Sequence, residues 1–329
     1  MLVIFDKCQD PYFNLASEEF LLAERRFAQP VIRLWQNSPA VIVGRFQNTL
    51  AEINREFVAE KSIAVVRRIT GGGAVYHDLG NVNYTVAQPT SGKIIDFAHF
   101  TEPVIELLAG YGIKAENHGR NDIEACGCKI SGGAQTIKDN RVLHHGTLLF
   151  AVKLDTLAQA LRAKEHKLAT RGVSSIRERV GNIVDFMRQP LPVEVFLKDL
   201  EKHFLKQPGS RPYEFSAREQ AAIQKLRDDK YSRWEWNYGQ SPDFNIERTV
   251  KYPWGELALF LLAKGGRIEE ISVYGDFFSQ SDVRGAFRKL RGAALEEASL
   301  REKIRQMDLA AVLPELTEQE LLAQLLNAA

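Results

Sequence analysis

Two arginines and three consecutive glycines stand side by side in the segment RRITGGGAVYHD, residues 67–78. Glycine lets a ligand approach the backbone closely, and consecutive peptide N–H groups can converge on an anion. Arginine adds a planar fork that suits phosphate or carboxylate oxygens. Because side chains alternate along a strand, only one of Arg67 and Arg68 can face such a ligand. A tight turn beside a solvated strand is the alternative, and the segment matches neither a P-loop nor a GxGxxG pattern.

A second glycine-rich bend follows a lysine in the segment KISGGAQ, residues 129–135. Lys129 begins a predicted strand, and Ser131, Gly132 and Gly133 come directly after it. A lysine beside bare backbone can present a point charge to a phosphate or to a developing oxyanion. An ordinary surface lysine is the alternative. Two glycine-rich strand ends that each carry cations favour a common cleft.

A third segment, LHHGTLLF at residues 143–150, brings two histidines to one strand. Alternation places His145 and Thr147 on one face and His144 on the other, and Gly146 again permits close approach. A structural histidine within a sheet is the alternative for either ring. The nearby HDLGN stretch predicts a turn in which His77 and Asp78 fix the loop by side-chain hydrogen bonds.

The cysteines give little support for metal or redox chemistry. Cys126 and Cys128 form a single C-x-C, which is poor zinc spacing, and no CxxC is present. A nucleophilic cysteine would need a base such as His144 or His145, and two small residues near a strand is the simpler interpretation. With Cys8 the count is odd, which points to a reducing compartment and no disulfide framework.

The composition is that of a globular protein. Of 329 residues, 45% are hydrophobic and 26% are charged, and 43 Lys and Arg against 42 Asp and Glu leave a net charge of +1. No global basic field attracts nucleic acid or an anionic membrane, so an anion site must be local. The sequence has no apolar run of membrane-spanning length and no signal-peptide pattern at its N-terminus, which predicts a cytoplasmic protein.

Helices and short strands alternate irregularly around these segments. Asn14 is expected to cap an early helix, and AVYHD and NVNYTVAQ are expected to form a pair of strands joined through Gly80. The remaining expectations are strands at 31–35, 40–44 and 62–69, helices near 51–61 and 100–110, a hairpin over 129–152, helices within 155–230, a hairpin over 255–278, and helical patterns to the end, including one from Thr317. A composition change places a domain boundary near residue 246, which divides the chain into 1–246 and 247–329.

Taken together and in this order, the segments resemble the lipoate–protein ligases in the long form with a C-terminal accessory domain. The matching stretches are NLASEE, VGRFQN, RRITGGGAVYHDLGN, GRNDI, KISGGAQ, HHGTLLF, VSSIRERVGN (173–182), WEWNYGQSPDF and, more loosely, KGGRIEEISVYGDFF. The resemblance implies an α+β fold. It combines a mixed-sheet catalytic domain of the biotin/lipoate protein ligase type with a small α/β C-terminal domain.

The resemblance also implies the chemistry. ATP and lipoate, or octanoate, form lipoyl-AMP and pyrophosphate, and the lipoyl group then passes to a lysine of an apo lipoyl domain. The implied acceptors are the E2 subunits of 2-oxoacid dehydrogenases and the glycine cleavage H protein, in lipoate salvage by a monomer that binds neither nucleic acid nor membranes. Lys129 matches the catalytic lysine that touches the lipoyl carbonyl and the adenylate phosphate. Asp122 is the implied Mg²⁺ ligand.

The ligand-binding residues carry over by their place in these motifs. The implied contacts with lipoate and nucleotide are Arg68, Gly71, Gly72, Gly73, Ala74, Val75, Tyr76, Asn81, Asn121, Asp122, Lys129, Ser131, Gly132, His145, Gly146 and Thr147. The family pattern gives Cys126 and Cys128 no role. Domain movement is expected from the family, and Gly239 and Pro242 are the candidate hinge positions.

Three other functions share parts of this pattern. A transferase could move octanoyl or lipoyl groups through a cysteine thioester, and a second kind would use only preformed lipoyl-AMP. A non-catalytic sensor would bind lipoate or nucleotide without forming an amide. The C-terminal domain argues against the first, and the intact Lys129 and glycine runs argue against the sensor.

Overall fold

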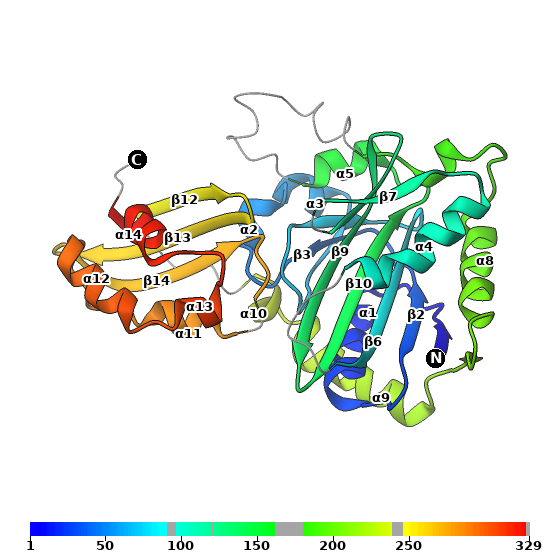
Figure 1. Cartoon of the computed structure of the whole chain (residues 1–329), viewed down its shortest axis with the longest axis horizontal. Helices are drawn as coiled ribbons and strands as arrows, with labels where there is room; N and C mark the ends of the chain where they lie inside the picture. Colours follow the sequence, from blue (N-terminus) through cyan, green and yellow to red (C-terminus); the bar gives the residue numbers. More distant parts are fainter. Residues whose placement is uncertain (91–96, 120, 162–179, 239–245, 280, 327–329) are drawn as a thin grey trace.

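The structure is a computed structural model of the chain, and it describes residues 1–90, 97–119, 121–161, 180–238, 246–279 and 281–326. Figure 1 shows a larger N-terminal lobe built around a long sheet and a smaller C-terminal lobe built around a second sheet. The predicted α+β class is confirmed, with a large mixed sheet, helices and a small C-terminal domain. Gly239, Pro242 and most of the VSSIRERVGN stretch lie outside the described residues.

Eight strands form the mixed sheet of the N-terminal lobe. They are β1 (Leu2–Phe5), β2 (Val31–Trp35), β6 (Asn81–Pro89), β7 (Ala115–His118), β8 (Asp122–Ala125), β9 (Cys128–Lys138), β10 (Arg141–Leu149) and β11 (Arg211–Pro212). Their order is β11–β1–β2–β6–β10–β9–β8–β7. β1 runs parallel to β2 and β11, and the other neighbours are antiparallel. The expected hairpin is confirmed as β9 and β10, with Asp139 and Asn140 at positive φ in its turn.

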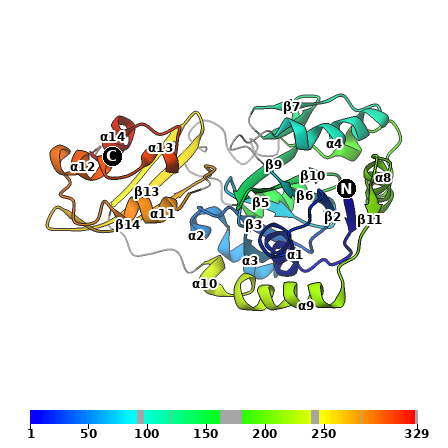
Figure 2. The same ribbon diagram turned by 60° about the horizontal axis from the view of Figure 1, so that its bottom comes forward.

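The helices of the N-terminal lobe either cover the faces of this sheet or pack against strands outside it. They are α1 (Pro11–Glu19), α2 (Thr49–Glu52), α3 (Arg55–Glu60), α4 (Ala98–Gly110), α5 (Leu154–Ala160), α8 (Val193–Leu205), α9 (Ala217–Leu226) and α10 (Trp234–Asn237), with single turns η1 (Phe20–Glu24), η2 (Ile183–Phe186) and η3 (Arg227–Tyr231). Alternation along β1 explains the two layers. Leu2 and Ile4 pack with Leu15 of α1, whereas Val3 packs with Phe196 of α8. Figure 2 shows α1 and α9 on one side and α4 and α8 on the other.

The predicted N-cap of α1 is wrong. Asp10 caps the helix by accepting the N–H of Tyr12, and Pro11 takes the first helical position. Asn14 lies one turn inside and is fully buried. Its side-chain amide donates to the carbonyls of Cys8 and Gln36. Asn14 therefore ties the helix to the loop after β2 instead of starting it.

A small sheet beside the large one carries the glycine run. Its strands are β3 (Ala40–Val43), β4 (Ala64–Arg67) and β5 (Val75–His77), in the order β4–β3–β5. β5 pairs with β3, so the expected pairing of β5 with β6 through Gly80 is wrong. Asp78 accepts the N–H groups of Gly80 and Lys153, which directs the chain from one sheet into the other. The predicted hydrogen-bonding role of Asp78 in this turn is confirmed.

The C-terminal lobe packs helices against an antiparallel sheet. Its elements are β12 (Ile246–Tyr252), β13 (Gly255–Lys264), β14 (Arg267–Gly275), α11 (Val283–Arg288), α12 (Glu297–Arg305), α13 (Leu309–Val312) and α14 (Glu318–Leu326). The expected hairpin over 255–278 and the Thr317 cap of α14 are confirmed. Phe46 of the N-terminal lobe belongs to the same hydrophobic core as this lobe. The domain boundary near residue 246 stays a prediction.

Candidate active site

The two arginines before the glycine run diverge as strand alternation requires. Arg67 is buried and points away from the run. Its guanidinium donates to the carbonyl oxygens of Gly44 (2.9 Å) and Gln47 (2.7 Å) and to the Thr49 hydroxyl (2.6 Å). Asn237 of α10 accepts the N–H of Arg67. Arg67 therefore fastens the small sheet to α2 and α10.

Arg68 turns the other way and grips the glycine run itself. Its Nη2 donates to the carbonyls of Gly71 (2.6 Å) and Gly73 (2.9 Å), and its Nη1 donates to Ile42 (3.1 Å). Its Nε donates to the hydroxyl of Thr70 at 2.9 Å. Burial lowers the pKa of Arg68 to about 10, so the group remains a cation at neutral pH. The structure thus places a fixed positive charge directly behind the run.

One of the three glycines lies in close contact with the C-terminal lobe. A Cβ atom on Gly71 would lie 2.1 Å from the carbonyl oxygen of Phe277 in the C-terminal lobe. Gly72 has a φ of +90° and donates its N–H to the same carbonyl at 3.3 Å. At Gly73 an added Cβ would meet no atom within 4 Å. Gly71 therefore serves the seam between the lobes, whereas Gly73 leaves space.

Lys129 forms an ion pair near the entrance of the site. Its Nζ lies 2.8 Å from Oδ1 of Asp122, and the two side chains are 35% and 27% exposed. Asn121 fixes the backbone beside them, because its side-chain amide donates to the carbonyl of Gly133 and its own carbonyl accepts the Gly133 N–H. Lys129 is thus half-buried and ion-paired at a strand end, which differs from the ordinary surface lysine that was the alternative.

The two histidines of β10 occupy opposite environments, as alternation predicts. His144 is buried and stacks on Phe100 with ring centroids 4.8 Å apart. Burial lowers the pKa of His144 well below its usual value, so the ring stays neutral. The Nδ1 of His145 lies 2.8 Å from a carboxylate oxygen of Glu18, and its Nε2 lies 2.9 Å from the hydroxyl of Thr70.

Arg68, Gly73, Lys129 and His145 are among the residues that line a narrow inner cavity of about 140 Å³. Its wall combines apolar side chains, bare backbone and cations. The lining residues are Leu15, Trp35, Ile42, Arg68, Gly72, Gly73, Ala74, Val75, His77, Asn83, Asn121, Lys129, Gly132, Gly133, Ala134, His145, Gly146 and Thr147. Burial lowers the pKa of His77 to about 3, so this ring adds no charge to the wall at neutral pH.

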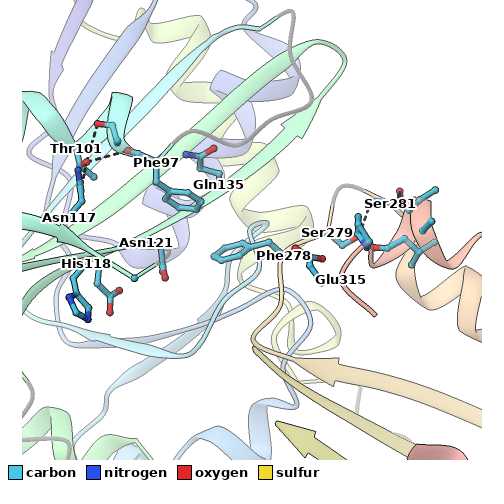
Figure 3. Close-up of a pocket in the computed structure, with 17 residues that line it drawn as sticks. Phe97, Thr101, Asn117, His118, Asn121, Gln135, Phe278, Ser279, Ser281 and Glu315 are labelled. Atoms are coloured by element: carbon cyan, nitrogen blue, oxygen red, sulfur yellow. Dashed lines mark hydrogen bonds between the residues drawn. The ribbon is translucent and has the colours of Figure 1, made fainter. Parts of the chain in front are cut away.

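A larger outer cavity of about 890 Å³ lies between the two lobes (Figure 3). The N-terminal lobe contributes polar groups, among them Asn117, Asn121 and Asp122. Phe97 and Phe278 approach each other from the two lobes, with ring centroids 5.8 Å apart. Asn121 lines both cavities, and the Lys129–Asp122 pair joins a residue of the inner cavity to a residue of the outer one.

Two protein-family models match the chain. Residues 10–205 match the lipoyl protein ligase A/B catalytic domain, and residues 241–325 match the bacterial lipoate protein ligase C-terminus. Lipoate-protein ligase LplJ of Bacillus subtilis is 38% identical over 317 residues, which covers 95% of this chain and 96% of the relative. The chain belongs to the lipoate–protein ligase family.

Other members of the lipoate–protein ligase family agree. Lipoate–protein ligase 1 of Staphylococcus aureus is 37% identical and covers 95% of this chain and 96% of its own length. A bi-partite lipoate protein ligase from Thermoplasma acidophilum, solved with its E2 lipoyl domain, matches with a TM-score of 0.65 at 27% identity over 74% of this chain and 98% of its own. A lipoate-protein ligase A bound with ATP matches with a TM-score of 0.61 at 26% identity over 72% of this chain and 98% of its own. The prediction of an enzyme of the ligase class is confirmed.

Most of the ligand-binding residues that the ligase resemblance implies converge on the inner cavity. Those that line it are Arg68, Gly72, Gly73, Ala74, Val75, Asn121, Lys129, Gly132, His145, Gly146 and Thr147. Asp122 lines the outer cavity. Four residues line neither, namely Gly71, Tyr76, Asn81 and Ser131. Tyr76 packs into the core of the small sheet, and Asn81 and Ser131 are buried in the large one.

Sequence reasoning missed several residues of the ligase cavity. Trp35, Ile42 and Asn83 come from strands with no motif of their own, and Leu15 comes from the NLASEE helix. His77 lines the cavity as well as joining the turn, where its Nδ1 lies 3.1 Å from the amide nitrogen of Asn37. Trp35, an aromatic residue at the end of its strand, was the one feature of the sequence that could have indicated a cavity residue. β3 pairs with β4 and β5, which flank the glycine run, and β2 pairs with β6; local sequence patterns do not encode these pairings.

Cys126 and Cys128 line neither cavity. Cys126 is exposed in the turn between β8 and β9 with a φ of +51°, and both thiols are free. Across the described residues, no helix of this ligase is long and apolar enough to span a membrane.

Proposed function

We propose that the chain is an ATP-dependent lipoate–protein ligase that works in two steps. Lipoate, or octanoate, reacts with ATP to give the acyl-adenylate and pyrophosphate, and the acyl group then passes to a lysine of an apo lipoyl domain with release of AMP. Lys129 carries this proposal. Lys129 lines the inner cavity and is paired with Asp122, which lines the outer cavity. A cation therefore lies between the proposed binding site for the acyl chain and the proposed binding site for the nucleotide.

The walls of the two cavities favour this division. Leu15, Trp35 and Ile42 give the inner cavity an apolar end that suits a lipoyl or octanoyl chain. Gly73 leaves room for the chain against bare backbone. The outer cavity is larger and presents amide and carboxylate groups, such as Asn117 and Asp122, beside the ring of Phe278. These groups offer hydrogen bonds and an aromatic face to a nucleotide.

Charge neutralisation is the main task of this site in the first step. An oxygen of the lipoate carboxylate attacks the α-phosphorus of ATP, and the bond to pyrophosphate breaks. Both reactants are anions that repel each other, so a nearby cation lowers the barrier by neutralising the charge that builds up. Lys129 supplies one cation beside Asp122, and Arg68 supplies another behind the glycine run.

The second step uses the same cation at the same carbon. The amine of the acceptor lysine attacks the acyl carbonyl, a tetrahedral oxyanion forms, and AMP leaves as the amide is made. In this proposal Lys129 stabilises that oxyanion, because the carbonyl remains where the adenylate was formed. No residue of this chain becomes acylated.

Magnesium fits this site through one carboxylate. Proteins hold Mg²⁺ at nucleotides with one or two carboxylates and the substrate phosphates. Asp122 offers such a carboxylate, and the described residues contain no group of three or more His, Cys, Asp or Glu that could hold a metal unaided. When bound, the ion neutralises phosphate charge. We therefore assign Asp122 as its protein ligand.

Two similar proteins of known structure support the proposed substrates of this chain. One neighbour is a lipoate-protein ligase A bound with ATP, and another was solved with its E2 lipoyl domain. We accordingly propose lipoyl domains of E2 subunits, and the glycine cleavage H protein, as acceptors of this chain. The monomeric state and the cytoplasmic location remain predictions.

The decisive experiment weighs the acceptor protein after reaction. Purified chain, ATP, Mg²⁺, lipoate and an apo lipoyl domain should give an acceptor heavier by one lipoyl group. Lys129→Ala should lower the rate roughly a hundredfold to a thousandfold, because a preorganised charge is lost from the reacting centre. Lys264→Ala is the control, since Lys264 is exposed in the C-terminal lobe and pairs only with Glu269 among the described residues.

Two outcomes would contradict this function. An acceptor of unchanged mass with the wild-type chain would overturn the ligase assignment, and near-normal activity of Lys129→Ala would overturn the role of Lys129. A Cys126→Ser, Cys128→Ser double variant should keep full activity. Its inactivity would favour the thioester transferase instead. Transfer from preformed lipoyl-AMP without pyrophosphate release from ATP would identify the transferase that uses only adenylate.

A further inference from the structure

A buried chain of hydrogen bonds runs behind the inner cavity and ends at the glycine run. Glu18 of α1 is fully buried, and its carboxylate lies 2.8 and 2.9 Å from Nδ1 of His145. Nε2 of His145 lies 2.9 Å from the hydroxyl oxygen of Thr70, and the same oxygen accepts the Nε–H of Arg68 at 2.9 Å. His145 and Arg68 line the cavity, whereas Glu18 and Thr70 lie behind it.

The donors and acceptors along this chain fix its protons. Arg68 can only donate, so the Thr70 oxygen accepts at that contact. Thr70 is fully buried, and the acceptor that the described residues offer to its hydroxyl hydrogen is Nε2 of His145. Nε2 must then be unprotonated, and the ring proton sits on Nδ1, where it is donated to Glu18. This is the Nδ1–H tautomer of a neutral imidazole.

The carboxylate end of the chain is itself fixed. The hydroxyl of Thr85 donates to Glu18 at 2.6 Å, and the indole N–H of Trp35 donates to Thr85 at 2.8 Å. Glu18 also supplies the charge that stabilises the cationic form of Arg68. Arg68 has no carboxylate in contact with it among the described residues, so a buried anion and a buried cation balance across two neutral groups.

The cation end of the chain sets the direction of the glycine run. Arg68 holds the carbonyls of Gly71 and Gly73 toward itself. The C=O and N–H of a trans peptide point in opposite directions. The N–H groups of the same two peptide units, which belong to Gly72 and Ala74, therefore point away from Arg68. The wall that Gly73 and Ala74 present to the cavity is therefore set before any ligand arrives.

We propose that Glu18 and Thr70 are positioning residues that act through His145 and Arg68. Glu18 accepts the Nδ1–H of His145 and so fixes the ring tautomer. Thr70 donates to Nε2 of that ring and accepts from Arg68, whose guanidinium orients the carbonyls of the glycine run. The proposal rests on the ligase function, because the wall in question receives the reacting carboxylate and phosphate. Neither residue lines the inner cavity.

The first test reads the tautomer without any enzyme activity. In ¹⁵N-histidine-labelled full-length protein, the His145 ring should show a protonated Nδ1 and an unprotonated Nε2, with the signal assigned by its loss in His145→Gln. A protonated Nε2 would overturn the proposal, whether or not the wild-type chain makes lipoyl-AMP. Glu18→Gln should let the Nε2–H tautomer appear. An unchanged ring signal in that variant would remove Glu18 from the proposal.

The second test measures lipoate-dependent release of pyrophosphate from ATP. Thr70→Val removes the hydroxyl from a bond to a charged group, so kcat/KM should fall roughly tenfold to a hundredfold. Thr70→Ser keeps the hydroxyl and should restore most of the activity. Thr49→Val is the matched control, because Thr49 is equally buried but accepts from Arg67, which points away from the cavity.

The outcomes separate positioning from general packing. Unchanged kinetics in Thr70→Val, or equal losses in Thr70→Val and Thr70→Ser, would overturn the proposal. Equal losses in Thr70→Val and Thr49→Val would do the same, since a merely structural role predicts that result. An inactive wild-type chain would instead overturn the proposed function, and the ring tautomer would still decide between the two arrangements of His145.

Discussion

Arg67 and Arg68 are neighbours of the same type, yet their tasks differ. Both are buried, and burial lowers the pKa of each to about 10. The guanidinium of Arg67 donates to the loop after β3, to Thr49 and to α10, whereas that of Arg68 donates to carbonyls of the glycine run. The sequence could predict this divergence, because alternation along a strand is a local property. It could not predict the carbonyl partners, which come from distant segments.

Replacing each arginine by lysine should separate stability from activity. Lysine keeps the charge but cannot hold several carbonyls with one planar fork. Arg68→Lys should therefore lower the rate of lipoate-dependent pyrophosphate release by about a hundredfold, on the scale of a lost preorganised group. Arg67→Lys should lower the unfolding temperature while each folded molecule keeps most of its activity. Equal activity losses in the two variants would contradict this assignment.

The buried histidines predict how stability depends on pH. The pKa of His77 is about 3 in the folded protein, below the ordinary value near 6.5 that applies on unfolding. Below about pH 6.5 the unfolded chain takes up a proton that the folded chain does not, so stability falls as the pH falls toward 3. The loss should approach about 1.4 kcal/mol per pH unit for this ring.

Denaturant unfolding at pH 7, 6 and 5 measures that slope. His77→Gln should flatten it by the contribution of one histidine, and buried His144 should account for a similar share. His118→Gln makes the same substitution at a histidine whose side chain is 63% exposed, for comparison. A slope that is the same in the wild type and in His77→Gln would refute the buried neutral ring.

At the scale of elements, local sequence patterns were sufficient to predict where strands lie but not which strands pair with each other. The β9–β10 hairpin was predictable because its two strands are adjacent and share a short turn. The β5 strand was predicted too, but its pairing with β3 depends on Asp78, which turns the chain between sheets. The resemblance implies that Gly71 contacts a ligand, whereas its contact with Phe277, far along the sequence, could not be predicted from local patterns.

Two alanine substitutions in the glycine run should therefore have different effects. Gly71→Ala places a Cβ against the Phe277 carbonyl and should loosen the C-terminal lobe, which limited proteolysis and small-angle scattering would detect. Gly73→Ala meets no protein atom within 4 Å, so it should leave the lobes in place but narrow the inner cavity and raise KM for lipoate. The reverse pattern would show that Gly71 serves the ligand.

At the scale of the molecule, the two lobes share packing across their seam. The rings of Phe46 and Phe277 stack with centroids 4.9 Å apart, and the N–H of Gly275 donates to the carbonyl of Phe46 at 2.9 Å. Phe46 belongs to the VGRFQN segment of the N-terminal lobe but to the core of the C-terminal one. The sequence indicated two domains, but no local pattern showed that one contributes a core residue to the other.

This shared residue makes a prediction about cooperativity. Phe46→Ala should cost about 3–5 kcal/mol, the usual range for removing a buried aromatic ring. Because the ring links the lobes, scanning calorimetry should show one unfolding transition in the wild type and two in the variant. Phe260→Ala is a control within the C-terminal lobe, since Phe260 lies in a separate cluster with Ala258 and Tyr274. Two transitions in the wild type would contradict this coupling.

The large sheet ends in two short strands, and this has a consequence for behaviour at high concentration. At one edge β11 has only two residues, and Pro212 has no N–H to offer to an incoming strand. At the other edge β7 is four residues long and carries the exposed side chains of Glu116, Asn117 and His118. Short, charged or proline-bearing edges resist pairing with another chain. Both edge strands of the large sheet therefore disfavour pairing with strands of other molecules, which should limit aggregation at high concentration.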